Sequence, residues 1–194
     1  MYLIFYGPEG SGKGTQAKLL NEKLKLPMLT SGDLVREASA HDRGIIGETC
    51  RRSIRVGHYV PDSEMFVMWK RRLKQKDARN GWIMDGFPRN LHQAKFLNAK
   101  IAKYGYKLDR VFYLNIPEKE SYRRLLARAR PLHEGSKVLH DTPRRIKNRL
   151  AFYNRNAPAV LDYYRKKGIL VEINADQAIR KVHQAITKHL PVQA

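Results

Sequence analysis

The chain has 194 residues with a hydrophobic content of 42%, which is enough for one sizeable core. Its 38 Lys and Arg residues against 18 Asp and Glu residues give a formal net charge of +20, which favours polyanionic partners such as nucleotides, nucleic acid or membrane surfaces. The single cysteine, Cys50, excludes an intrachain disulfide and a thiolate zinc cluster built within one chain.

The apolar runs are short, and the N-terminus lacks the basic and apolar segments of a signal peptide. A membrane-spanning helix needs roughly 20 apolar residues, far more than any run offers. We therefore expect a cytoplasmic protein without a membrane partner. No linker-like stretch divides the chain, so we predict a single domain over 1–194.

Short apolar runs alternate with long helix-compatible stretches. The strand-like runs lie at 2–6, 27–30, 82–85, 110–114 and 169–173. This alternation predicts an α/β fold with a parallel five-stranded sheet, helices on both faces, and functional loops at the carboxyl ends of the strands. Two regions, about 31–79 and 131–143, break the alternation and are interpreted as inserts that flank a cleft.

A glycine-rich turn directly follows the first predicted strand and precedes a helix-compatible segment. It reads Gly7-Pro-Glu-Gly-Ser-Gly-Lys-Gly-Thr15. Glycines let backbone N–H groups turn inward around a phosphate, and the helix start adds its positive dipole end. Lys13 is placed to reach the β- and γ-phosphates, with Thr15 or a nearby hydroxyl on the metal-bound side. The alternative is a plain connector, which this strand-turn-helix context disfavours.

The pattern Gly-x-x-Gly-x-Gly-Lys-Gly-Thr-Gln resembles the phosphate loop of adenylate kinases and other nucleoside-monophosphate kinases. The resemblance implies a P-loop NTPase three-layer fold with core segments 1–30, 80–128 and 142–194. It also implies a helical monophosphate-binding insert at about 31–60 and a short lid at about 129–141. One departure is Pro8-Glu9, because the family places its proline directly before the second glycine.

Three later segments resemble the acceptor side of these kinases. They are Ser31-Gly-Asp-Leu-Val-Arg36, Gly57-His-Tyr-Val-Pro-Asp62 and Asp85-Gly-Phe-Pro-Arg89. By resemblance, Asp33 and Asp85 hold Mg²⁺ through water, which suits an ion that keeps much of its hydration shell. Taken alone, Ser31 or Asp33 is a candidate helix cap, and the other two segments are candidate turns or helix starts.

Acceptor choice depends on the residue four positions after Arg89. Adenylate kinases carry Gln there, as this chain does at Gln93, whereas UMP/CMP kinases typically carry Asn. A carboxamide offers the donor and acceptor that the adenine N6 and N1 edge requires. Asn90 points the other way, because it is common in the UMP/CMP group. We weigh Gln93 more heavily, since it is the residue that would contact the base.

The lid segment is basic but incomplete. Arg124 and Arg128 lie at i and i+4 on one helix face and resemble the family's lid entrance, although a solvated basic face is the alternative. The family pattern Arg-x-Asp-Asp is replaced by Val138-Leu-His140-Asp, so the expected arginine is missing. The candidates to replace its charge are Lys137, Arg130 and Arg144.

The resemblance implies the following site. The catalytic residues are Lys13, Arg89, Arg128 and Arg149. The ATP-binding residues are Gly10, Ser11, Gly12, Lys13, Gly14, Thr15, Arg124, Arg128 and Gln177. The AMP-binding residues are Ser31, Arg36, His58, Tyr59, Val60, Gly86, Phe87, Pro88, Arg89, Gln93 and Arg149.

The implied activity is the reversible reaction of MgATP with AMP to give two ADP, by direct in-line transfer in a monomer that uses Mg²⁺ and no zinc. Positioning and charge neutralisation would supply the catalysis. The alternatives are a UMP/CMP kinase of the same fold, or a catalytically weakened nucleotide- or RNA-binding relative. The basic charge is compatible with nucleic acid, but the motifs do not predict such a partner.

Overall fold

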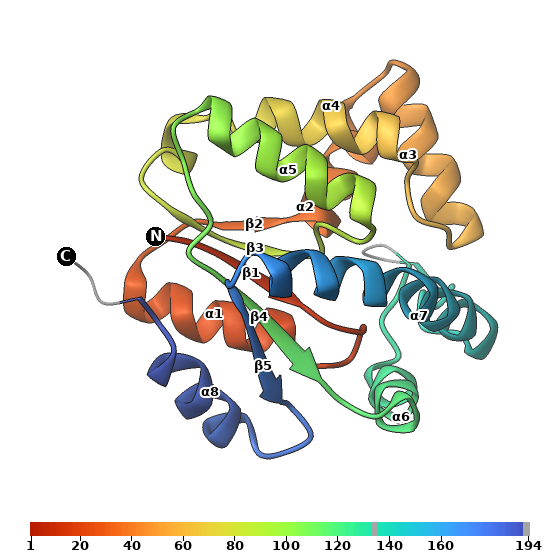
Figure 1. The fold of residues 1–194 in the computed structure, drawn as a ribbon. Coiled ribbons are helices and arrows are strands. Elements are labelled where there is room, and N and C mark those ends of the chain that lie inside the picture. The colour runs from red at the N-terminus through yellow and green to blue at the C-terminus, as the bar shows by residue number, and fades with distance from the viewer. Residues whose placement is uncertain (133–135, 192–194) are drawn as a thin grey trace.

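A computed structural model describes residues 1–132 and 136–191 of the chain. Five parallel strands form one central sheet in the order β2-β3-β1-β4-β5 (Figure 1). The strands are β1 (Tyr2–Tyr6), β2 (Met28–Thr30), β3 (Trp82–Asp85), β4 (Arg110–Asn115) and β5 (Leu170–Asn174). The parallel five-stranded sheet predicted from the sequence is therefore confirmed.

The helices are α1 (Lys13–Leu24), α2 (Ser31–His41), α3 (Ile45–Val56), α4 (Asp62–Arg72), α5 (Leu91–Lys103), α6 (Glu118–Arg128), α7 (Pro143–Lys166) and α8 (Ile179–Lys188), with a short 3₁₀ turn at Lys76–Ala78. No helix among the described residues is both long and apolar enough to cross a membrane.

The strands present apolar side chains to both faces of the sheet, as expected for a parallel sheet covered by helices. Leu3 and Phe5 of β1 pack in one buried cluster with residues of α1 and α8. Ile4 and Tyr6 point the other way, into a larger cluster with residues of α4, α5 and α7. Figure 1 shows the resulting three layers, with α1 and α8 on one side of the sheet and α4, α5 and α7 on the other.

The helix that follows β2 is capped by a residue other than those expected. Thr30 is the N-cap of α2: its Oγ1 accepts from the backbone N–H of Asp33 at 3.0 Å and donates to Asp33 Oδ2 at 2.6 Å. The prediction that Ser31 or Asp33 caps this helix was therefore wrong. The extended backbone of Thr30 at the end of β2 suits a cap, while Ser31 already lies inside the helix and donates to Gly86 O at 2.7 Å.

The chain order reverses around β1, since β2 and β3 lie on one side of it and β4 and β5 on the other. In such folds, ligands bind outside the carboxyl ends of the strands, at the place where the strand order reverses. The loops after β1 and β3 both emerge there. The segments expected to form the insert and the lid, about 31–60 and 129–141, flank the same edge, and residues 133–135 of the lid lie outside the described part of the chain.

Candidate active site

A cleft of about 950 Å³ opens at this edge of the sheet. Its lining comes from the phosphate loop, from α2 and the turn before α4, from the loop after β3, and from the lid around Arg130 to Leu132. Segments distant in sequence thus enclose one space large enough for a nucleotide-sized ligand.

The loop after β1 forms an open cradle whose shape requires glycine. Gly7 has φ near +141°, and a Cβ there would lie 2.5 Å from the carbonyl oxygen of Leu114. Gly12 has φ near +90° and immediately precedes α1, so the positive end of this helix faces the cradle. Lys13 Nζ donates to the carbonyl oxygens of Gly7 at 2.9 Å and Pro8 at 2.6 Å, so its ammonium lies across the loop.

Asp85 ends β3 and faces this loop, since a Cβ on Gly14 would lie 3.6 Å from its Oδ2. Burial raises the pKa of Asp85 despite the opposing charges of Lys13 and Arg89. A buried carboxylate with a raised pKa favours a nearby cation, so Asp85 fits a role beside hydrated Mg²⁺.

Asp33 has a different environment from Asp85. Its side chain is 67% exposed, and its two carboxylate oxygens already bind Thr30 and Arg36, each at 2.6 Å. The described residues hold no cluster of three or more His, Cys, Asp or Glu side chains able to bind a metal ion by themselves. A metal here would therefore need water or phosphate oxygens as further ligands.

The acceptor side is built around Arg89, near the end of the loop between β3 and α5. Arg89 Nε donates to Gly86 O at 2.8 Å, and its guanidinium carbon lies 3.8 Å from the ring centroid of Tyr59. The guanidinium is thus held flat against an aromatic face. Arg89 Nη1 is buried and has no hydrogen-bond partner among the described residues, so it presents an unsatisfied donor beside the cleft.

Gln93 is held in one orientation by its neighbours. Its Oε1 accepts from the backbone N–H of Arg89 at 2.8 Å, and its Nε2 donates to Asp62 Oδ1 at 2.7 Å. These contacts leave one N–H and one acceptor lone pair of the carboxamide. Asn90, the residue that pointed towards UMP/CMP kinases, is the N-cap of α5, with its Oδ1 accepting from the Gln93 N–H at 2.8 Å.

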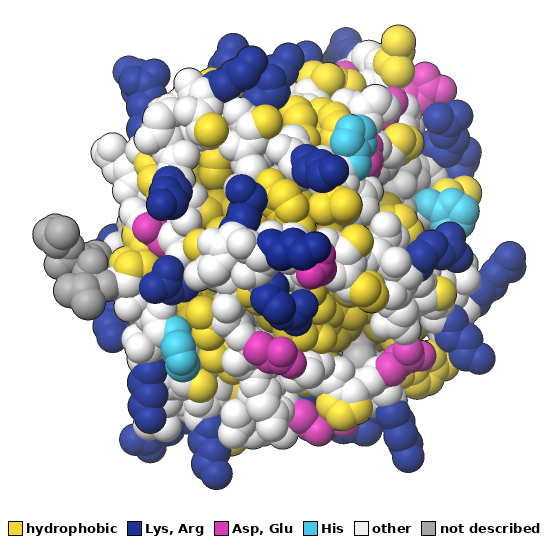
Figure 2. Space-filling model, in the orientation of Figure 1, with side chains coloured by type: hydrophobic (Ala, Val, Ile, Leu, Met, Phe, Trp, Pro, Cys, Tyr) yellow, Lys and Arg dark blue, Asp and Glu magenta, His cyan; other side chains and the backbone are white. Residues whose placement is uncertain are grey.

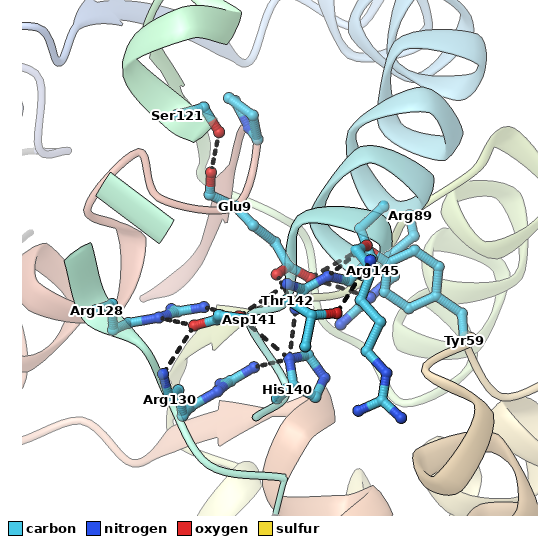
Figure 3. A network of polar contacts seen from close by, with 12 residues as sticks. Glu9, Tyr59, Arg89, Ser121, Arg128, Arg130, His140, Asp141, Thr142 and Arg145 are labelled. Atoms are coloured by element: carbon cyan, nitrogen blue, oxygen red, sulfur yellow. Dashed lines mark hydrogen bonds and ion pairs between the residues drawn. The ribbon is translucent and has the colours of Figure 1, made fainter. Parts of the chain in front are cut away.

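Asp141, at the start of α7, anchors two arginines. Its side chain is fully buried, and Arg128 donates to both of its oxygens, from Nε at 2.8 Å and from Nη2 at 3.1 Å. Arg149, only 3% exposed, donates from Nη2 to Asp141 Oδ1 at 2.8 Å. Burial would raise the pKa of Asp141, but the hydrogen bonds from Arg128 and Arg149 and the positive charge of Arg128 hold it well below its usual range. Figure 3 shows Arg128, Arg130 and His140 gathered around Asp141.

His140 accepts from arginines where the family has an aspartate. Its Nδ1 lies 3.0 Å from Arg130 Nη2 and 2.6 Å from Arg149 Nη1. Burial and these two positive charges lower the pKa of His140, although Asp141 opposes them, so its imidazole is neutral. An Nδ1 that faces two guanidiniums is an acceptor, and its 3.3 Å approach to Asp141 Oδ1 is then only a contact.

Arg130, rather than residue 138, brings a lid guanidinium to the cleft. Val138 is 54% exposed and lies outside the cleft lining, which includes Arg130 and His140. Burial lowers the pKa of Arg130, as do the neighbouring charges of Arg128 and Arg149, against the opposing effect of Glu9 and Asp141. Of the three candidates for the missing charge, Lys137 and Arg144 do not line the cleft.

The structure brings most of the expected site residues to this one cleft. Three of them do not line it: Ser11, Arg149 and Gln177. Ser11 is buried within the phosphate loop, and Arg149 is buried behind Glu9 and Asp141. Gln177 is exposed and donates to Asn174 O at 2.7 Å.

One of the two lid-entrance arginines, Arg124, forms ion pairs with carboxylates on either side of it. It lies 2.6 Å from Glu120 and 3.3 Å from Asp176.

Two acidic residues that line the cleft were not assigned a role from the sequence. Glu9 contacts Arg149 and Tyr59, and Asp62 holds Gln93. A signal for Glu9 was available, because a carboxylate inside a phosphate loop is electrostatically unfavourable unless cations lie beside it. No comparable pattern marks Asp62, whose position before a helix also suits a helix start.

The comparison with known proteins agrees with this geometry. The family model described as adenylate kinase matches residues 5–169. An adenylate kinase of Leptospira biflexa is 37% identical over 188 residues, covering 97% of this chain and 98% of that protein. An adenylate kinase of Thermobifida fusca is 38% identical over 184 residues, covering 95% of this chain and 95% of that protein. An adenylate kinase of Archaeoglobus fulgidus is 34% identical over 210 residues, covering 96% of each. The chain belongs to the adenylate kinase family.

Proposed function

We propose that this protein transfers the terminal phosphoryl group of MgATP to AMP, giving two ADP, by direct in-line displacement. The observation that carries the proposal is that the phosphate loop and the arginine-lined acceptor pocket open into one cleft. Two phosphate-binding sites in one cleft allow transfer without a covalent enzyme intermediate.

On the donor side, the loop amides and Lys13 would cradle the ATP phosphates, and Asp85 would orient waters on Mg²⁺. When bound with ATP, magnesium would neutralise negative charge on the β- and γ-phosphates. Lys13 must leave the carbonyl oxygens of Gly7 and Pro8 to reach these phosphates. Burial lowers the pKa of Lys13, while the carboxylates of Asp85 and Glu9 act in the opposite direction.

On the acceptor side, Arg36, Arg89 and Arg149 would bind the AMP phosphate, and the free N–H and lone pair of Gln93 would meet the adenine N6 and N1 edge. The fixed orientation of Gln93 supports this choice of base. Arg128, Arg149 and Arg130 would neutralise charge on the transferring group. No side chain is assigned as general base, because positioning and charge dominate this chemistry.

Closure of the 31–60 insert and of the lid over the substrates would exclude water, which otherwise competes as acceptor. We also propose a monomer that acts in the cytoplasm. On the face drawn in Figure 2, Lys and Arg side chains are spread among other residue types and do not form a single basic groove. The distribution on this face therefore does not favour nucleic-acid binding there.

A coupled assay with MgATP and each of AMP, UMP, CMP and GMP tests the proposal. AMP should be the best acceptor by kcat/KM, and Lys13→Met should abolish transfer while the protein remains folded. AMP as the poorest acceptor would exclude the assignment in favour of a UMP/CMP kinase. Salt-sensitive RNA binding together with negligible transfer would instead indicate a weakened relative.

A further inference from the structure

Glu9 extends from the phosphate loop towards the acceptor-side arginines. Its Oε2 lies 2.7 Å from Arg149 Nη1, and its Oε1 lies 3.9 Å from Arg89 Nη1. Tyr59 donates its hydroxyl to Oε1 at 3.0 Å, and the backbone oxygen of Glu9 accepts from the hydroxyl of Ser121. Figure 3 shows Glu9 reaching from Ser121 towards Tyr59 and Arg89.

The Glu9 carboxylate is ionised in this position. Burial would raise its pKa, but the positive charges of Arg149, Arg89, Lys13 and Arg130 outweigh burial and hold the pKa below its usual range. The Glu9 carboxylate thus lies among four cations, which is the kind of environment that a bound phosphate group would also occupy. Glu9 therefore carries the negative charge of the site in the structure.

The fit of this carboxylate to the arginines is incomplete. Glu9 Oε2 and Arg89 Nη1 are both buried without a hydrogen-bond partner among the described residues, so the close approach to Arg149 is an ion pair without hydrogen-bond alignment. A tetrahedral phosphate offers more acceptor oxygens than a planar carboxylate and could satisfy donors that Glu9 leaves unpaired. The arginines are thus held near each other, yet remain available to a better anion.

We propose that Glu9 is an internal counter-anion of the phosphate site, which holds Arg89 and Arg149 in the absence of substrate and which the phosphate of AMP must displace. The inference rests on the proposed function of the cleft. Glu9 is a positioning residue: its negative charge offsets the repulsion between the guanidiniums of Arg89 and Arg149, and it lowers the affinity for AMP. The proline that the family places here has no charge with which to do this.

Calorimetric titrations of AMP and of adenosine into wild type and Glu9→Gln test the proposal. Adenosine has the same base and sugar as AMP but no phosphate, so it reports the base site alone. We expect Glu9→Gln to lower the Kd for AMP by about fivefold, because one negative charge no longer competes with the phosphate. The Kd for adenosine should remain unchanged.

Glu118→Gln is the matched control, since Glu118 is exposed, lies outside the cleft lining and bonds Asn154 at 2.5 Å. It should leave both dissociation constants at the wild-type value. Glu9→Ala is a second variant, with circular dichroism and thermal unfolding to establish that each variant is folded. If a folded Glu9 variant binds AMP as weakly as wild type or more weakly, or if adenosine affinity changes in parallel, the proposal is wrong.

The same proteins separate this inference from the proposed function. Wild type that forms ADP from MgATP and AMP, together with an unchanged AMP affinity in Glu9→Gln, would overturn only the counter-anion role. Wild type that binds AMP but forms no ADP would overturn the proposed reaction, while the AMP and adenosine titrations would still decide the role of Glu9. Under the proposal, the KM for AMP falls in Glu9→Gln by more than kcat changes.

Discussion

Gln93 Nε2 donates to Asp62 Oδ1 over 2.7 Å, so a carboxylate from the start of α4 fixes the orientation of a side-chain amide that lines the cleft. Asn90 Nδ2 contacts the same carboxylate at 3.1 and 3.2 Å. An ionised carboxylate only accepts hydrogen bonds, so the amide nitrogen must point towards it and the amide oxygen away. Asp62 therefore decides which donor and acceptor Gln93 presents to the cleft.

Replacing Asp62 should weaken selection of the base. In Asp62→Ala the amide of Gln93 loses its fixed orientation, and we expect the KM for AMP to rise about tenfold, the loss of roughly one buried hydrogen bond to a charged group. Selectivity for AMP over CMP and UMP should fall with it. Steady-state kinetics with the three acceptors measures both effects. Ser63→Ala, which removes an exposed hydroxyl bonded to Glu64, should change neither.

Asp141 should be required for stability. Asp141→Asn removes the buried carboxylate that pairs with Arg128 and with Arg149, which is 3% exposed and then keeps only Glu9 as an acidic partner, and we expect the free energy of unfolding to fall by about 3 kcal/mol. Urea denaturation measures this loss. The control is Asp162→Asn, because Asp162 pairs with Lys166 on the surface at 51% and 77% exposure, and its loss should cost less than about 1 kcal/mol. Equal effects of the two substitutions would contradict the role of burial.

The contribution of Asp141 should also depend on pH. The folded-state pKa of Asp141 is depressed, so its stabilising effect is complete above the unfolded pKa of about 3.9 and is lost as the pH falls towards the folded value. Urea unfolding at pH 6 and pH 3 should therefore show wild type and Asp141→Asn differing most at pH 6. A difference that grows on acidification would mean that the carboxylate is not the stabilising form.

Arg130 should supply the lid charge that Val138 does not. Arg130→Met should lower kcat by roughly a hundredfold, somewhat less than the effect of an arginine finger on a transferring phosphoryl group. Its effect on the KM for AMP should be small, since the acceptor phosphate is assigned to other arginines. Lys137→Met and Arg144→Met, whose parent residues do not line the cleft, are the controls and should retain near wild-type kcat. The reverse order of effects would assign the charge to one of those residues.

The sequence predicted the sheet well because its strands are apolar runs bounded by glycine, proline and long amphipathic stretches. Trp82–Asp85 was placed with its observed bounds, while the last strand begins at Leu170 and continues to Asn174. The phosphate loop could be located because its chemistry is local to nine residues. The cap at Thr30 was missed, since neighbouring Ser31 and Asp33 carry equally suitable side chains and only the backbone course decides between them.

The parts that escaped prediction depend on contacts between distant segments. Glu9 meets Tyr59 and Arg149, which are 50 and 140 positions away along the chain. Periodicity and motif spacing carry no information about such pairs. The burial of Arg149 likewise follows from the packing of α7 against the phosphate loop and the lid, whereas its sequence context is strongly basic.

The neutral side chain of His140 affects how much positive charge the cleft retains. Its imidazole accepts from Arg130 and Arg149 at 3.0 and 2.6 Å without neutralising either guanidinium. An aspartate at this position would place an anion between the same two groups, whereas an arginine in place of the exposed Val138 would add its charge outside the cleft lining. The imidazole therefore orients the two arginines and leaves their charge available to a phosphate.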